Sequence, residues 1–245
     1  MSRTFEILER VRQDQELFRT PPVTKDPTGA DRVASYAPPD LGAPAREEIR
    51  KLVQSLFLAK SGNGHHGPRR VVFCGIEEAD GSNLLCARVG RNLAEQVHSQ
   101  VCIVDANLRF PGVGRLFDPV PLESDHASAT MVSRRVGDNL WLVCGDSVSA
   151  NGAGPTLDQL QVCVRDLGDE FAYAVMNAPP VGLYNDAVLL GQMADGVVLV
   201  VEANSTRRAA TQKAKQALES SNVRVLGSVL NNRTFPIPEK LYRLL

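Results

Sequence analysis

The chain has 245 residues, of which 43% are hydrophobic, enough for one sizeable α/β core and little for a second domain. Its formal net charge of −1 excludes an overall electrostatic bias toward nucleic acid or an anionic membrane. We therefore expect no nucleic-acid partner. Neither a signal-peptide pattern nor an apolar run of about 18 residues is seen, which predicts a cytoplasmic protein.

The N-terminal region is predicted to be separate from the main domain. Apolar residues recur there at helical spacing among charges: Phe5, Leu8, Val11 and Leu17. They predict a helix within residues 1–19. Prolines and glycines then predict a flexible linker over residues 20–43. The helix either caps the main domain or docks onto another protein through its apolar stripe.

The main domain is predicted over residues 44–245. A helical pattern over 44–60 comes first, and strand and helix signals then alternate. Strand-like runs fall at about 70–75, 101–105, 139–144, 172–177, 196–202 and 223–230. Helical patterns fall at about 83–98, 156–168, 184–193 and 206–220. This alternation predicts an α/β domain of three layers, a mainly parallel sheet with helices on both faces.

Cysteines and histidines give no metal-site pattern. The five cysteines form no C-x-x-C pair, and several lie in apolar runs, which indicates reduced core thiols. His65 and His66 are adjacent without a nearby third ligand, which favours a solvated loop. Arg207, Arg208 and the lysines after them predict a solvated basic helix face. We expect no metal ligand among these residues.

A strand, a turn and a helix over residues 71–85 have the order of a phosphate-binding loop. The working loop ends in Gly-Lys-Ser/Thr, whereas here Gly81 is followed by Ser82 and Asn83. No lysine is available to neutralise a triphosphate. This segment predicts a nucleotide-binding fold from which the nucleotide chemistry has been lost.

The same turn carries three acidic residues, Glu77, Glu78 and Asp80. At an effective dielectric constant of about 20, each close contact between like charges costs on the order of a few kcal/mol. The turn is therefore expected to repel a phosphate.

Two later segments carry longer motifs: Val104-Asp-Ala-Asn-Leu-Arg-Phe-Pro, and Asn177-Ala-Pro-Pro with Asp186-Ala downstream. They resemble motifs of the bacterial tyrosine kinases of capsule and exopolysaccharide synthesis. The first is similar to that family's second phosphate-site motif, Val-Asp-x-Asp-Leu-Arg-x-Pro, and the second to its Walker B segment, Asp-x-Pro-Pro. The resemblance spans residues 44–232. It implies the P-loop NTPase fold shared with the MinD and ParA ATPases.

The resemblance also shows where the chain departs from the family. It places Ser82 at the lysine, Asn83 at the metal-binding hydroxyl, Asn107 at the second aspartate and Asn177 at the Walker B aspartate. Phosphoryl transfer depends on positioning and charge neutralisation. We therefore predict no catalytic residue and no cofactor.

Asp105 alone matches the acidic set, and it would be a metal ligand only if the site were active. Otherwise Asp105 caps the turn after its strand or pairs with Arg109. If a nucleotide binds at all, the resemblance implies contacts from Gly81, Ser82, Asn83, Asp105 and Asn231.

The first functional hypothesis is a non-catalytic, kinase-like partner in exopolysaccharide or capsule synthesis. The resemblance implies a membrane-anchored chain-length regulator or a catalytic homologue as its partner, which could recruit it to the inner membrane. The family's oligomerisation motif, Glu-x-x-Arg-x-x-Arg, is matched by Glu47 and Arg50, with Val53 at its third position. A homo-oligomer through this helix is the other assembly that the resemblance implies.

The alternative is an active tyrosine autokinase or ATPase that uses ATP and Mg²⁺ in an unorthodox site. It would borrow a cation from elsewhere, for example Arg69, Arg70 or Arg109, and Tyr242 would be its phosphorylation site. A partition-type positioning protein ranks last, because residues 75–84 contain no lysine to reach across a nucleotide-bound dimer.

Overall fold

The computed structural model describes residues 42–59, 69–77, 81–109, 111–117, 127–128, 131–144, 162, 164–167 and 170–233. The chain divides into two units, Met1–Ala34 and Ser35–Leu245, and all described residues belong to the second. Several predictions lie outside the described residues: the N-terminal helix, the linker up to residue 41, His65 and His66, Glu78 and Asp80, and Tyr242.

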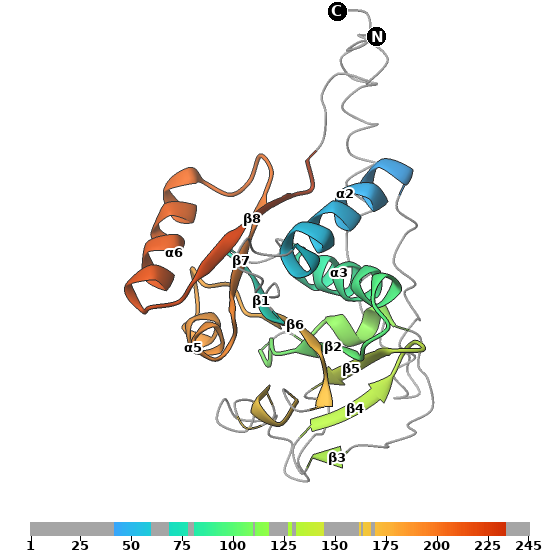
Figure 1. Ribbon diagram of the computed structural model, residues 1–245. Coiled ribbons are helices and arrows are strands. Elements are labelled where there is room, and N and C mark those ends of the chain that lie inside the picture. The colour runs from blue at the N-terminus through green and yellow to red at the C-terminus, as the bar shows by residue number, and fades with distance from the viewer. Residues whose placement is uncertain are drawn as a thin grey trace, which may run out of the picture. The chain divides into compact units, whose positions relative to one another are not determined.

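The described unit is built on an eight-stranded sheet with the order β3-β4-β5-β2-β6-β1-β7-β8 (Figure 1). The six strands from β5 to β8 in this order run parallel. Their bounds are β1 Arg70–Gly75, β2 Val101–Asp105, β5 Leu140–Cys144, β6 Tyr173–Ala178, β7 Gly196–Glu202 and β8 Val225–Asn231. Each lies within about two residues of its predicted run, since central parallel strands are continuous apolar segments.

Two strands at one edge were not predicted. β3, Ala127–Ser128, and β4, Met131–Arg135, add to β5 as an antiparallel hairpin. β4 has the sequence Met-Val-Ser-Arg-Arg, in which no apolar residues alternate with polar ones. Its place in the sheet comes from pairing with the apolar β5, a contact that local sequence does not encode.

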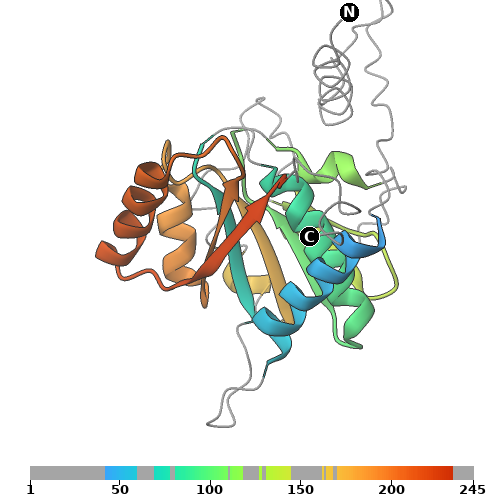
Figure 2. The ribbon, with the colours of Figure 1, turned by 90° about the horizontal axis from the view of Figure 1, so that it is seen from above.

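Helices cover both faces of the sheet, as predicted (Figure 2). α2, Ala43–Val53, and α3, Ser82–Gln96, lie on one face, while α5, Asp186–Met193, and α6, Arg208–Ser220, lie on the other. Strand residues alternate between the two cores. Val71 and Phe73 pack with the α2 and α3 side, and Val72 and Cys74 with the α5 and α6 side.

The helix boundaries differ from prediction by up to two residues for α3, α5 and α6. The pattern over 44–60 is an α-helix that begins at Ala43 and continues as the π-helical turn η1, Gln54–Leu58. The predicted helix over 156–168 lies largely outside the described residues, although 162 and 164–167 are helical. No helix in the described ranges is long and apolar enough to cross a membrane.

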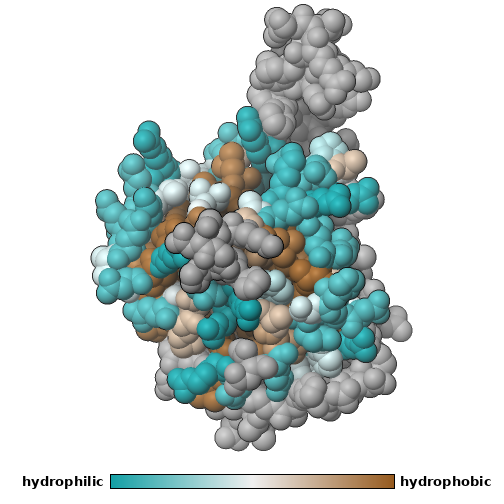
Figure 3. Space-filling model, in the orientation of Figure 1, coloured by the Kyte–Doolittle hydropathy of each residue, from teal (hydrophilic) through white to brown (hydrophobic). Residues whose placement is uncertain are grey.

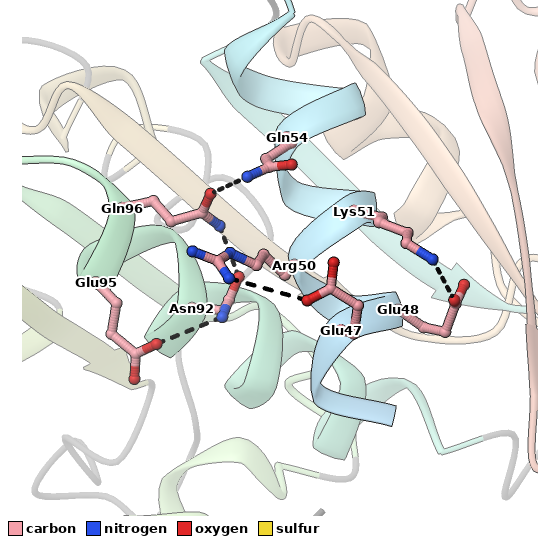
Figure 4. A network of polar contacts seen from close by, with 8 residues as sticks. All are labelled: Glu47, Glu48, Arg50, Lys51, Gln54, Asn92, Glu95 and Gln96. Carbon is pink, nitrogen blue, oxygen red and sulfur yellow. Dashed lines mark hydrogen bonds and ion pairs between the residues drawn. The ribbon is translucent and has the colours of Figure 1, made fainter. Parts of the chain in front are cut away.

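Polar contacts on the surface join α2 to α3 (Figure 4). Gln54 Nε2, at the start of η1 directly after α2, donates to Gln96 Oε1 on α3 at 3.0 Å, and Gln96 in turn donates to Asn92. Beneath this polar layer, Val53 and Phe57 are buried in the core. The helical pattern predicted over 44–60 therefore buries an apolar face against the core.

Candidate functional site

The predicted site residues meet at the carboxyl edge of the parallel strands, where ligands of such sheets bind. Gly81 precedes α3, which follows β1, and Asp105 ends β2. Asn177 lies in β6, directly opposite Asp105 in the parallel register. The topology therefore places the loop that follows β1 beside the ends of β2 and β6.

Asp105 closes the loop that follows its own strand. Its side chain is 1% exposed, and Oδ2 accepts hydrogen bonds from the backbone N–H groups of Gly112 at 2.8 Å and Val113 at 2.9 Å. Val113 begins the short 3₁₀ helix η2, Val113–Leu116. The capping role considered from the sequence is confirmed.

Arg109 does not serve as the partner of Asp105. Its Nε instead donates to Asp186 Oδ2 at 3.0 Å, and its guanidinium lies 4.4 Å from the ring centroid of Tyr184. The guanidinium thus joins the loop after β2 to the N-terminus of α5. Of the two alternatives for Asp105, the structure therefore shows the cap and not the pair with Arg109.

Asn177 bridges the other two polar groups of the site. Its fully buried side chain donates through Nδ2 to Asn83 Oδ1 at 2.6 Å and to Asp105 Oδ1 at 3.1 Å. On the opposite side of the amide, Cys86 Sγ lies 3.8 Å from Asn177 Oδ1 and donates to it. The Nδ2 group of Asn177 thus occupies both side-chain oxygens, Asn83 Oδ1 and Asp105 Oδ1, that could serve as ligands of a cation.

Burial raises the pKa of Asp105. Hydrogen bonds from Asn177 and from the backbone of Gly112, Val113 and Asn107 act in the opposite direction, because they stabilise the ionised carboxylate. Desolvation is the larger effect. The protein holds this carboxylate with neutral donors, which compensate only part of the cost of removing it from water.

The remaining predicted residues border this network. Ser82 and Asn107 are 8% and 6% exposed. Gly81 has φ of 76°, a left-handed conformation that favours glycine. A Cβ atom at Gly81 would also lie 2.3 Å from Asn231 Nδ2, so Asn231 packs directly against the start of α3. The structure therefore gathers at one edge all seven residues that the sequence assigned to the site.

Two features of the site were not predicted from the sequence: the contact of Cys86 with Asn177 and the aromatic contact of Arg109. Cys86 lies three residues after Asn83 on α3, and helical spacing would have placed both on one face. The Arg109–Tyr184 contact joins segments far apart in the chain, so no local sequence pattern predicts it. Glu77 is exposed, while Cys74, Cys86 and Cys102 are buried thiols, as predicted for core cysteines.

Within the described ranges, no group of three histidine, cysteine, aspartate or glutamate side chains is arranged to hold a metal ion. A groove between α6 and the β7 and β8 strands is lined by none of the seven site residues. The polar network at the carboxyl edge, and not this groove, is therefore the candidate nucleotide site.

Comparison with known proteins shows what this chain is similar to. Tyrosine-protein kinase CapB of Staphylococcus aureus is 22% identical over 194 residues, which cover 76% of this chain and 83% of CapB. Tyrosine-protein kinase CpsD of Streptococcus agalactiae is 39% identical over 61 residues, 25% of this chain and 27% of CpsD. The latter match therefore spans less than a third of that relative.

The crystal structure of the chimerical protein CapA2B2 has the same fold, with a TM-score of 0.64 at 17% identity. The match covers 79% of this chain and 87% of that one. The chain is therefore similar to bacterial tyrosine kinases in sequence and shares the fold of a solved member of that group. No protein-family model matches it.

Proposed function

We propose that this kinase-like chain is a non-catalytic partner protein in bacterial capsule or exopolysaccharide synthesis. The proposal combines its similarity to bacterial tyrosine kinases with the chemistry at the carboxyl edge. Its relatives are named as tyrosine kinases, and this chain keeps their fold while carrying serine and asparagine at charged or metal-binding positions. A binding function does not require those groups.

The amide of Asn177 carries the proposal. A magnesium ion bound by a P-loop protein needs oxygen ligands and acidic side chains around it. Here Nδ2 of Asn177 donates to Asn83 Oδ1 and Asp105 Oδ1, so these oxygens already accept hydrogen bonds. A cation would have to displace a buried donor, and the site would lose two hydrogen bonds.

The partner that we propose is a membrane-anchored chain-length regulator or a catalytic homologue. Binding to such a partner would bring the chain to the inner membrane from the cytoplasm. CapB aligns over 76% of this chain. We propose that the contact uses a surface that the chain shares with such kinases. We propose no cofactor for this role.

Calorimetric titration of ATP and ADP, with and without Mg²⁺, tests the proposal directly. We expect no binding by the natural chain at nucleotide concentrations up to about 1 mM, equivalent to a binding free energy weaker than about −4 kcal/mol. Magnesium-dependent binding in the micromolar range would contradict the proposal and would make Asp105 the first residue to mutate.

A gain-of-function variant tests which groups are missing. The combined changes Ser82→Lys, Asn83→Ser and Asn177→Asp restore the lysine, the hydroxyl and the Walker B carboxylate, so we expect Mg²⁺-dependent ATP binding. Ser99→Lys is the control for the lysine of this variant, because it adds one positive charge at the other end of β2. Binding by the control variant would show that added charge alone is sufficient.

An active tyrosine autokinase is the second candidate, because Asp105 is retained and the relatives are named as kinases. Its test is phosphotyrosine on Tyr242 after incubation with Mg-ATP, in the isolated chain and in the complex with its partner. Absence of the modification in both would remove this candidate. Its presence, lost in Asp105→Asn, would replace the first proposal.

A further inference from the structure

A groove of about 650 Å³ separates α6 from the last two strands of the sheet. Its floor is apolar and comes from β7 and β8: Leu199, Val201, Val225 and Leu230. Its rim comes from one face of α6: Arg208, Thr211, Gln212 and Lys215. Hydrophobic surface lies beside the hydrophilic outer face of α6 on this side of the molecule (Figure 3).

The groove exists because a small residue of β8 faces the helix. Ser228 lines the groove and lies opposite Leu199 in the register, on the face of the sheet that packs with α5 and α6. Gly227, opposite Val198, borders the groove only through its backbone. On the helix, Ala214 and Leu218 are buried, and Ala210 is partly buried against the same core. The helix residues that line the groove are polar, so they border it instead of closing it.

The rim is positively charged. Arg208 and Lys215 line the groove, and no aspartate or glutamate is among the lining residues. Lys215 Nζ lies 3.5 Å from Glu219, but both side chains are more than half exposed, so this pair is weak. Arg208 makes no ion pair with another described residue. A ligand that carries carboxylates would complement this rim.

The adjoining edge of the sheet is also open to a partner. β8 is last in the strand order, and within the described residues it pairs on one side only, with β7. Backbone N–H and C=O groups along such an edge can accept an added strand. Leu230, on this strand, is 54% exposed. An added strand would cover it and would direct alternate side chains toward the groove.

We propose that this groove and the β8 edge bind an extended, acidic peptide segment of a partner protein. Apolar side chains of the peptide enter the groove, carboxylates pair with Arg208 and Lys215, and the peptide backbone extends the sheet. A flat anionic membrane can neither fill the concave groove nor form hydrogen bonds along the backbone of the β8 edge. A second copy of the chain would bring like charges together across the same face.

Selection from a library of displayed random 12-residue peptides, with the full chain as bait, tests the proposal without a known partner. We expect enriched peptides to carry carboxylates and apolar residues, and to lose affinity as salt is raised. Arg208→Glu should weaken the best peptide at least about tenfold in fluorescence anisotropy. Ser228→Trp, which fills the groove without changing charge, should weaken it similarly.

Lys213→Glu is the matched control, since Lys213 is exposed on the same helix but does not line the groove. It should change affinity by less than about twofold. Equal losses in Arg208→Glu and Lys213→Glu would overturn the proposal in favour of diffuse charge attraction. Failure to enrich any acidic peptide would also overturn it, as would binding to phosphatidylglycerol vesicles that Arg208→Glu abolishes while peptides do not bind.

Discussion

At the scale of single residues, one amide determines the character of the candidate site. Asn177 is fully buried and forms hydrogen bonds with Asp105, Asn83 and Cys86. Buried polar groups are tolerated when each finds a partner, and here every polar atom of the amide has one. The hydrogen bonds that stabilise the fold here also occupy the oxygen atoms of Asn83 and Asp105 that a metal ion would need as ligands.

Replacing this amide by a carboxylate should destabilise the protein. Asn177→Asp puts a second carboxylate beside Asp105 without a cation, and we expect a loss of about 2–4 kcal/mol in the free energy of unfolding near neutral pH. Added Mg²⁺ should recover part of the loss. Chemical denaturation with and without Mg²⁺ measures both effects.

Asn222→Asp makes the same chemical change at an exposed turn residue with φ of 56°, where aspartate is tolerated. It should shift stability by less than about 0.5 kcal/mol and show no response to Mg²⁺. If Asn177→Asp behaves like this control, the amide is not a structural bridge.

The buried carboxylate of Asp105 should leave a signature in the pH dependence of stability. Because burial raises its pKa in the folded state, the folded protein binds this proton more tightly than the unfolded chain does. Its contribution to stability therefore grows as pH falls from above the raised pKa toward the unfolded value of about 3.9.

Comparison with Asp105→Asn isolates this contribution. The variant loses at least one acceptor and should be less stable by about 1–3 kcal/mol, with the difference widening as pH is lowered. Denaturation from pH 7 to pH 4 measures the difference. If the difference in stability between the two proteins became smaller at low pH, folding would lower the pKa of Asp105 instead of raising it.

At the scale of elements, close approach between helix and sheet holds the site in place. α3 carries Asn83 and Cys86 on the face that meets the strands, and Gly90 lets the same helix pack against β2. A Cβ atom at Gly90 would lie 2.4 Å from Cδ1 and Cγ1 of Ile103. The spacing of α3 from β2 therefore depends on one missing side chain.

Gly90→Ala should destabilise the protein by about 1–3 kcal/mol, because overpacking outweighs the gain of about 1 kcal/mol in helix propensity. Gly227→Ala is its control, since the added methyl group meets open space and should cost less than about 0.5 kcal/mol. Thermal denaturation of the two variants measures the contrast. Equal stability would show that α3 shifts without cost.

At the scale of the whole molecule, α2 is the surface on which the family's resemblance predicts self-association. Glu47 and Arg50 pair within the helix at 3.9 Å, and both side chains are more than half exposed (Figure 4). Val53, at the third position of the motif, is fully buried in the core. One of the three contact positions is therefore unavailable to another subunit.

We therefore expect the purified chain to sediment as a monomer at micromolar concentration. An exposed ion pair contributes less than about 1 kcal/mol, too little for stable association by itself. Sedimentation velocity of the natural chain and of a Glu47→Ala, Arg50→Ala variant tests this. An oligomer that the double substitution dissociates would show instead that two motif residues suffice.

Sequence by itself determined the features that depend on neighbouring residues. The six parallel strands are continuous apolar runs, and the absence of lysine between residues 75 and 84 is read directly from the sequence.

Tertiary structure decided what depends on segments far apart in the chain. Asn177 reaches Asp105 because their strands are adjacent, and β4 is a strand because β5 pairs with it. The groove along α6 likewise arises where the small side chain of Ser228 on β8 faces the helix. Local patterns encode propensity, whereas contacts between distant segments depend on how the chain packs, and the chemistry of this site belongs to the second kind.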